Sequence, residues 1–507
     1  MRYFLTFLIC IALISISSCR KDFSTIPSSG NLEFSKDTVF LDTIFTNIGS
    51  STYKLKVYNR GNNAITIPKI KLEKGTSSNY RLNVDGIPGK DFSNIDILAK
   101  DSIFVFIETT VNVAKETNPL YTDRILFDNG NNQQDVDLVT LVKDANFIFP
   151  ERNPTSMKVD NLILDGKQTT VKGRFLEPNE LTFSKTKPTV IYGYAAVPAN
   201  KTLTIEAGAR VHFHDNSGLI VDNKATLKVN GTLTEKVIIE GDRLEHSFSE
   251  IPGQWGFIFI RPGSVNNLIE NTIIKNGVAG ILMGDLLGSN KKTKLTIKNS
   301  EIYNNAAYGI WARNSEIVAH NLVIGNAGEA SLATTLGGTY NFTHSTFANF
   351  WNNGIRQNPA VLVNNFQDFK EKDKPETRVL KDLKAANFTN CIFDGNNNFE
   401  LLFDKVEGSL FNYSVRNSLI KYNPSNENLK KLPEMDFTNS LFYKNIITNG
   451  NPVFRNPQKE DFIIGEKSDA INKAISTPFT TDILGVNRSS NPDVGAYQHI
   501  KFKEKNP

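Results

Sequence analysis

The sequence predicts an all-β protein in two parts, a β-sandwich followed by a longer parallel β-helix. Over the first part, apolar and polar residues alternate with a period of two in short segments. Throughout the second half, a six-residue pattern recurs, and turns rich in Asn and Gly separate the apolar segments. The 507 residues are enough for two or three domains of this kind.

Residues 1–18 are predicted to be an export signal. Arg2 supplies a positive charge, and the apolar run from Phe4 to Ile16 is broken only by two hydroxyl residues. A membrane-spanning helix needs about 20 apolar residues, so this run is too short to span and has the length of a signal-peptide core. It ends in the sequence Ile16-Ser17-Ser18-Cys19.

That ending resembles a bacterial lipobox, in which an aliphatic residue and two small residues precede Cys. The resemblance implies that Cys19 carries a thioether-linked diacylglycerol and becomes the first residue of the exported protein. Two or more acyl chains hold a protein on a membrane stably, at about 0.8 kcal/mol for each buried CH₂. An ordinary secretory signal with an incidental Cys is the alternative.

The prediction is therefore an outer-membrane lipoprotein of the cell envelope, on either face of that membrane. Arg20-Lys21-Asp22 resembles the surface-export signals of Bacteroidetes lipoproteins. Residues 19–31, rich in Ser, Thr and Pro, are predicted to be a flexible tether.

Charge and cysteine content restrict the classes of partner and of chemistry. A net charge of +4 from 57 basic and 53 acidic residues, with no basic block, argues against a nucleic-acid partner. Of the three cysteines, Cys10 leaves with the signal and Cys19 carries lipid, so Cys391 has no disulfide partner. Other copies of the repeat have Ser, Thr or Asn where Cys391 stands, which predicts a small packed residue rather than a nucleophile.

Residues 32–146 are predicted to form a β-sandwich of immunoglobulin type, with seven or eight strands in about 110 residues. Tyr53, Leu55 and Val57 alternate with outward residues, and the segment 103–107 is apolar on both faces and should be a central strand. The domain resembles the Ig-like modules between anchor and effector domain in Bacteroidetes surface lipoproteins. Residues 147–190 are predicted to be a connector and the first cap of the β-helix.

The repeat lies within residues 191–500. Its pattern is an apolar residue, any residue, a polar residue that is often Asn or His, a small or amide residue, any residue and an apolar residue. Most copies are 21 to 29 residues apart, which is typical of one β-helix coil, because stacked coils share a core and pair their backbones about 4.8 Å apart. Asn suits the stacked turns, since it tolerates left-handed backbone angles. The copies occupy residues 268–273, 297–302, 318–323, 342–347, 388–393, 415–420 and 437–442.

One step between copies is longer, at 46 residues, and contains a charged insertion at 367–386. We expect a short helix there on Val379, Leu380 and Leu383. The main rival for the whole region is a leucine-rich repeat, and Leu is too sparse at the positions which that fold requires.

Segments at both ends of this region resemble right-handed β-helix repeat proteins. The opening segment 197–208 and the sequence Gly253-Gln254-Trp255-Gly256 match the first coils of that family. Motifs between residues 451 and 497, the last of them at 492–497, match its closing segment, although Gln498 stands where most members have Glu. The resemblance covers about residues 190–500 and implies a right-handed helix. The family includes polysaccharide lyases, glycoside hydrolases and non-catalytic adhesins, so the fold does not determine the function.

The repeat contains no recognisable set of catalytic residues. A hydrolase needs two carboxylates about 5 Å or about 6.5–9.5 Å apart, and a lyase of this family typically uses Lys or Arg with Ca²⁺ held by acidic residues. His212 and His214 share a strand face beside Asp215 without a third ligand, which favours a solvated face over a metal site. No cofactor is expected, except Ca²⁺ if the protein is a lyase. The acids of the repeat are scattered: Asp285, Glu301, Glu316, Glu329 and Asp394.

A binding site is predicted from the residues after recurring Gly-Ile pairs. Alternation places Ile310 and Ile355 inside, and Trp311 and Arg356 on the same exposed sheet, with Arg313 nearby. Aromatic rings stack on sugars and Arg binds carboxylates with two hydrogen bonds, which together suit an acidic glycan. In the alternative, Trp311 covers a loop and Arg356 is merely solvated.

The leading hypothesis is a non-catalytic lipoprotein that binds glycan or another surface partner. The alternatives are a polysaccharide lyase or glycoside hydrolase acting on an acidic polysaccharide, and an architectural spacer.

Overall fold

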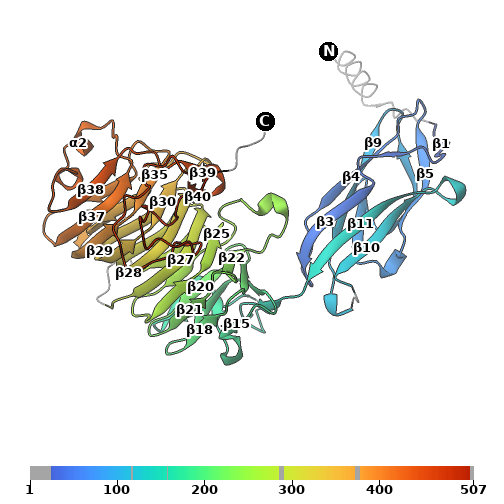
Figure 1. Ribbon diagram of the computed structural model, residues 1–507. Coiled ribbons are helices and arrows are strands. Elements are labelled where there is room, and N and C mark those ends of the chain that lie inside the picture. The colour runs from blue at the N-terminus through green and yellow to red at the C-terminus, as the bar shows by residue number, and fades with distance from the viewer. Residues whose placement is uncertain (1–23, 116–117, 157, 285–290, 371–376, 503–507) are drawn as a thin grey trace, which may run out of the picture. The chain divides into compact units, whose positions relative to one another are not determined.

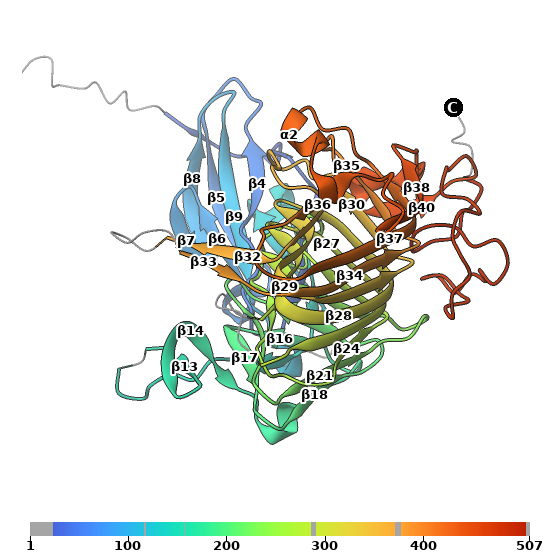
Figure 2. The ribbon, with the colours of Figure 1, turned by 90° about the vertical axis from the view of Figure 1, so that its left-hand side faces the viewer.

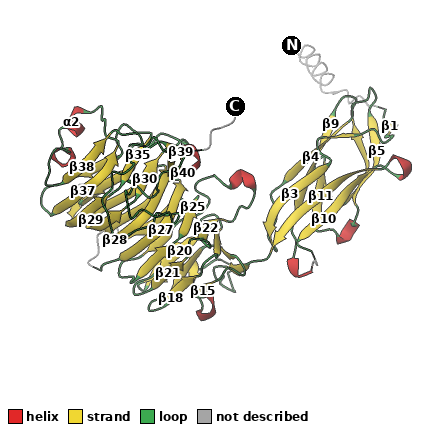
Figure 3. Cartoon of the chain, in the orientation of Figure 1, coloured by secondary structure: helices red, strands yellow, loops and turns green. Residues whose placement is uncertain are grey.

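The computed structural model describes residues 24–115, 118–156, 158–284, 291–370 and 377–502 (Figure 1). The predicted export signal and Cys19 lie outside these residues. The chain divides into two compact units, Met1–Asp144 and Ala145–Pro507. Within the described ranges, no helix is long and apolar enough to cross a membrane. Strands dominate both units (Figure 3), which confirms the predicted all-β class.

The first unit contains two sheets that share one hydrophobic core. Strand β9 lies between β4 and β6, so segment 103–107 forms an interior strand as predicted. Its Ile103, Val105 and Ile107 are buried, whereas Phe104 and Phe106 lie on the exposed face. The immunoglobulin-type assignment stays a prediction. One sheet comprises β1 (Ile26–Pro27), β3 (Thr38–Phe45), β5 (Ile65–Leu72), β8 (Asp91–Ile97), β10 (Leu120–Phe127) and β11 (Gln134–Lys143), and the other β2 (Glu33–Phe34), β4 (Tyr53–Tyr58), β6 (Tyr80–Val84), β7 (Ile87–Gly89) and β9 (Ser102–Thr109).

The second unit is a right-handed parallel β-helix made of three stacks of parallel strands, which we call the first, second and third stacks. The first stack contains β12 (Asn146–Ile148), β16 (Thr189–Ile191), β19 (Arg210–Phe213), β22 (Val237–Gly241), β25 (Thr272–Lys275), β30 (Thr346–Asn349) and β35 (Ile392–Gly395). The second contains β14 (Lys167–Phe175), β17 (Tyr194–Val197), β20 (Gly218–Val221), β23 (Ile258–Ile260), β26 (Ala279–Met283), β31 (Val361–Asn364) and β36 (Leu401–Asp404). The third contains β15 (Thr182–Phe183), β18 (Thr202–Ile205), β21 (Thr226–Asn230), β24 (Asn267–Glu270) and β34 (Leu383–Thr389).

Long strands bend through the corners and join neighbouring stacks. Strand β28 contributes residues 308–313 to the second stack, 316–320 to the third and 323–325 to the first. Because β12, the end of β14 and β15 already pair with β16, β17 and β18, the stacking begins at Asn146 rather than at residue 191. The other bent strands are β27 (Lys294–Asn305), β29 (Ala330–Thr343), β37 (Phe411–Ile420) and β38 (Tyr443–Thr448).

The stacked Asn turns form as predicted. Asn side chains donate to one another between coils, from Asn321 to Asn299 at 2.8 Å and from Asn445 to Asn417 at 3.4 Å. An amide that accepts and donates can satisfy its neighbours along the whole ladder. The residues of this ladder with positive φ are Asn271, Asn299, Asn321, His344, Asn390, Asn417 and Asn445.

Two local predictions are wrong. Where a helix was expected in the insertion, β32 (Phe366–Phe369) pairs with β33 (Thr377–Leu380) as an antiparallel hairpin, and Leu383 begins β34. The copy at 437–442 forms turns, and Leu441 is 82% exposed. There the Asp436 carboxylate accepts hydrogen bonds from the backbone N–H and hydroxyl of Thr438, a local turn that competes with a strand.

The C-terminal segment, residues 451–502, runs back over the outward face of the first stack. Its short hairpin of β39 (Phe454–Asn456) and β40 (Asp461–Ile464) lies near β30 and β35 in Figure 1. Phe462 and Ile483 pack there with Val323 and Ala348. The closing sequence predicted from resemblance therefore covers a side of the helix.

Candidate functional site

The outward side of the third stack carries an open, polar array. In β29, β34 and β37 the inward residues Phe342, Phe388 and Val415 are fully buried. Alternation turns their neighbours to the outside. Figure 2 shows the strands of this stack one above another, among them β24, β28, β34 and β37. We call the outward set the polar face; it consists of Asn341, Thr343, Asn387, Thr389, Ser414 and Arg416.

These side chains stand in two parallel rows. Asn341, Asn387 and Ser414 are in register on successive coils, and so are Thr343, Thr389 and Arg416. The Asn387 amide donates to the Asn341 carbonyl oxygen at 2.9 Å, and Arg416 Nε donates to Ser414 Oγ at 3.2 Å. Together the six side chains line a hollow of about 330 Å³.

Amides, hydroxyls and one guanidinium repeat at the coil spacing of about 4.8 Å. Such an array can donate to and accept from the hydroxyls of an extended ligand. It contains no carboxylate, so it has no acid–base pair of the kind that glycoside hydrolysis needs.

Arg356 is not on an exposed sheet, so that geometric prediction is wrong. Its side chain is 2% exposed and forms two hydrogen bonds, of 2.6 and 2.8 Å, with the fully buried carboxylate of Glu400. Ile355 points outward instead and is 96% exposed. The segment around Ile355 is an irregular loop rather than a strand, so the alternation that was assumed does not apply.

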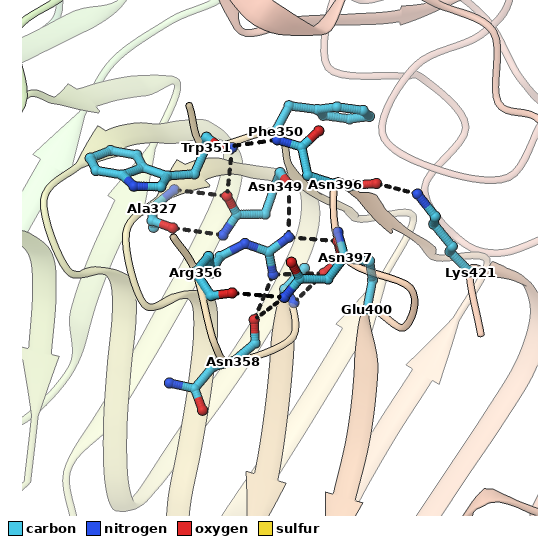
Figure 4. A network of polar contacts seen from close by, with 12 residues as sticks. Ala327, Asn349, Phe350, Trp351, Arg356, Asn358, Asn396, Asn397, Glu400 and Lys421 are labelled. Atoms are coloured by element: carbon cyan, nitrogen blue, oxygen red, sulfur yellow. Dashed lines mark hydrogen bonds and ion pairs between the residues drawn. The ribbon is translucent and has the colours of Figure 1, made fainter. Parts of the chain in front are cut away.

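The Arg356–Glu400 pair holds a loop in place (Figure 4). Arg356 also donates to the backbone carbonyls of Asn349 and Asn358, and Glu400 accepts from the backbone N–H groups of Ala360 and Asn397. Burial raises the pKa of Glu400, and the Arg356 guanidinium opposes that shift. With these partners already in place, Arg356 has a structural role and does not offer its guanidinium to a glycan.

Trp311 and Arg313 do lie together on the second stack. The Arg313 guanidinium carbon is 4.4 Å from the centre of the Trp311 ring, and the Tyr308 ring is 4.8 Å away. Trp311 Nε1 donates to Thr335 Oγ1 at 3.0 Å, and Arg313 is only 7% exposed. The Trp311 ring is therefore partly covered by its own neighbours, which reduces the surface that a sugar could contact.

His212, in β19, and His214, directly after that strand, have different environments. His212 is 2% exposed and its Nδ1 lies 3.0 Å from the Gly241 carbonyl, so the solvated strand face expected there is wrong for this residue. Burial lowers the pKa of His212. His214 pairs with Asp242 at 2.8 Å, and that hydrogen bond raises its pKa. Among the described residues, no group of three or more His, Cys, Asp or Glu could hold a metal ion.

Three of the scattered acids of the repeat have local partners. Glu301 pairs with Lys236 and Glu316 with Lys294, each at 2.6 Å, and Glu329 accepts from Asn358. Burial raises the pKa of Asp394 to about 6. Asp285 lies outside the described residues.

Cys391 is the small, packed residue that the repeat predicts. It is fully buried, its backbone N–H donates to Ser418 Oγ, and burial raises its thiol pKa to about 12. A thiol with so high a pKa is a poor nucleophile near neutral pH.

Sequence reasoning missed the polar face, although a signal for it existed. Thr343, Thr389 and Arg416 are each the second residue of a repeat copy, and Asn341, Asn387 and Ser414 each precede a copy. Both positions flank a buried apolar residue, so aligning the copies would have placed them side by side.

One comparison with known proteins bears on the architecture of part of the chain. The family model described as "Right handed beta helix region" matches residues 182–347. No curated protein matches the sequence.

Two solved structures of carbohydrate-active enzymes are among the structural matches. One is the catalytic unit of a thermostable GH87 α-1,3-glucanase from Streptomyces thermodiastaticus strain HF3-3, at 12% identity and a TM-score of 0.24, covering 72% of this chain and 79% of that one. The other is a family 123 glycoside hydrolase from Clostridium perfringens, at 9% identity and a TM-score of 0.17, covering 24% of this chain. The chain spans 30% of the length of that hydrolase. Such distant likeness does not bear on activity.

Proposed function

We propose that this protein is a lipid-anchored, non-catalytic component of the cell envelope whose β-helix binds glycan on the polar face. In this proposal, Cys19 carries the anchor, and residues 32–146 form an Ig-like spacer that follows the tether. The observation that carries the glycan proposal is the register of Asn, Thr, Ser and Arg side chains over three successive coils.

The chemistry of the polar face suits an extended polyol. Its rows offer amide and hydroxyl groups that both donate and accept, and Arg416 adds a charge-assisted donor. The backbone beneath is a rigid sheet, so these groups are ordered before the ligand arrives, which lowers the entropic cost of binding. Trp311 and Arg313 are engaged with neighbouring groups and Arg356 is buried, so the proposal places the glycan on the polar face and not on these three residues.

Retention on immobilised polysaccharides tests glycan binding. The full chain with Cys19→Ser, which prevents lipidation, is compared with the same chain also carrying Asn387→Ala and Arg416→Ala. We expect the double variant to bind at least tenfold more weakly, since two hydrogen-bonding groups, one of them charged, are lost. Lys228→Ala is the matched control, an exposed cation on the same stack several coils away.

Equal retention of the double variant and the control would reject the polar face as the site. Retention on no glycan would favour the architectural spacer. Release of unsaturated uronates or new reducing ends from acidic polysaccharides would instead support a lyase or hydrolase.

The anchor is tested separately. Cells grown with an alkyne analogue of palmitate should label the wild-type protein, and Cys19→Ser should abolish the label and release the protein from the membrane fraction. An unchanged label in this variant would reject Cys19 as the acylated residue.

A further inference from the structure

A second cavity lies on the other side of the β-helix, beneath the hairpin of β13 (Asn161–Leu164) and β14. The two strands are joined by Asp165-Gly166, both with positive φ, the geometry of a tight two-residue hairpin turn. The end of β14 pairs with β17, so the hairpin is attached to the second stack at its base (Figure 2).

The tip of the hairpin is also fastened. The Asp165 carboxylate lies 2.5 Å from Arg261 at the end of β23, and the same guanidinium bonds to Asp222. Leu162 packs with Ala196 and Ile220 near the base. The hairpin is therefore held at both ends over the outward side of the second stack. Strand pairing, ion pairs and apolar packing thus maintain the cavity beneath it.

The floor of this cavity is apolar. Ile220 and Phe259 are in register on successive coils, and Val278, which is 43% exposed, adds to the same surface. The rings of Tyr194 and Phe257, 5.3 Å apart, complete it. The cavity volume is about 1070 Å³, slightly more than the roughly 300–1,000 Å³ that small-molecule sites occupy.

The lining is also positively charged. Lys167 and Lys172 from β14 and Lys291 line the cavity, and all three are exposed. The acidic residue of the lining, Asp165, is already paired with Arg261. An apolar floor beside exposed lysines complements a ligand that has an apolar body and a negative charge.

We propose that this cavity binds a single-chain anionic amphiphile, specifically a long-chain fatty acid. The acyl chain lies on the floor formed by Phe259 and Val278, and the carboxylate pairs with a lysine of β14, Lys167 or Lys172. Ile220 and Val278 are the aliphatic part of this floor, and sugar hydroxyls buried against them would lose hydrogen bonds, whereas an acyl chain would not. Each CH₂ removed from water strengthens binding roughly fourfold.

Fluorescence titration with cis-parinaric acid, a fatty acid that brightens in apolar surroundings, tests the proposal on the full chain with Cys19→Ser. Val278→Asp places a negative charge on the floor and should weaken binding at least tenfold. Val265→Asp is the matched control, because Val265 is also 43% exposed and lies outside the cavity lining. The control should bind within twofold of the parent protein.

A second arm tests the charge. Lys167→Glu with Lys172→Glu should weaken binding of the probe at least fivefold, whereas Lys201→Glu with Lys228→Glu, the same change on exposed lysines elsewhere, should not. Laurate should displace the probe at lower concentration than dodecanol, which has the same chain without the charge.

Equal losses in Val278→Asp and Val265→Asp would overturn the proposal, as would equal displacement by laurate and dodecanol. Displacement by an acidic oligosaccharide but not by laurate would assign the cavity to a glycan. None of these results depends on the polar face, so this proposal and the proposed function can fail separately.

Discussion

The outward faces of the first and third stacks differ, although the same coils build both. On the first stack, Val323, Ile392 and Leu419 point outward and are nonetheless fully buried under the C-terminal segment. On the third stack, Thr343 and Arg416 occupy outward positions and remain accessible. The inward residues are alike on both stacks, so the two faces differ in their outward residues and in whether the C-terminal segment covers them.

The covering segment is held by polar contacts as well as by apolar packing. The turn amides of Asn321, Asn390 and Asn417 donate to backbone carbonyls of Thr481, Ile475 and Lys473 respectively. The ladder that stacks the coils thus also binds the returning chain. The third stack has no comparable cover among the described residues.

The largest loss of stability is expected from a substitution that disrupts the packing of the C-terminal segment on the first stack. Phe462→Ala removes a fully buried ring that contacts Gly325 and should lower the free energy of unfolding by about 3–5 kcal/mol. Urea unfolding followed by tryptophan fluorescence measures it. Ile475→Ala, in the same segment but at a side chain 42% exposed, is the control and should cost much less. Equal costs would show that the packing of Phe462 is not what holds the cover.

Replacing the buried Arg356 should destabilise the fold much more than replacing the exposed Arg416. Arg356→Met leaves the Glu400 carboxylate buried without its cation and should cost about 3–5 kcal/mol. Arg416→Met on the polar face should change stability by less than about 0.5 kcal/mol. Thermal and urea unfolding of both variants provide the comparison. The double variant Arg356→Met, Glu400→Met should recover most of the loss; if it does not, the buried pair is not the cause.

Lowering the pH should destabilise the fold through protonation of His344, which lies on the side that the C-terminal segment covers. Burial lowers the pKa of this histidine to about 3, against about 6.5 in an unfolded chain. The neutral form is favoured in the fold, so its stabilising contribution is complete above pH 6.5 and falls as the pH drops towards 3. The loss approaches about 1.4 kcal/mol per pH unit.

His344→Asn, which inserts the residue that other coils carry, should therefore lose less stability between pH 7 and pH 4.5 than the parent protein. Urea midpoints at the two pH values measure the difference. His320, whose pKa burial lowers to about 4, is present in both proteins. Identical pH dependences would reject the role of His344.

The smallest effect is expected on the open face. Thr389→Val keeps the shape and the strand preference of a partly exposed residue, so stability should change by less than about 0.5 kcal/mol. Differential scanning calorimetry checks this. A larger loss of stability would mean that the Thr389 hydroxyl stabilises the fold, which would argue against a role of this row in ligand binding.

Repeats made much of the fold predictable. Asn299, Asn390 and Asn417 show the turn geometry that the pattern predicted, and Cys391 packs as its equivalents in other copies implied. Such features depend on contacts between neighbouring coils, so their signal lies within one repeat. The helix expected at Val379 failed because β32 and β33 pair with each other, and local spacing does not reveal that partnership.

The site was less predictable than the fold. Arg356 follows a Gly-Ile pair like Trp311, yet it points into a buried network because Glu400, more than forty residues later, supplies the matching charge. Likewise, the local sequence around Val323 and Ile392 does not indicate that residues 451–502 cover them.

The sequence by itself determined the all-β class, the coil period and the inward and outward alternation, because these follow from side-chain spacing along a strand. Only the tertiary structure decided which outward face is covered, which stays open, and that a hairpin encloses an apolar cavity beside lysines. These outcomes depend on contacts between segments far apart in the chain, where packing and charge pairing, rather than local pattern, set the free energy.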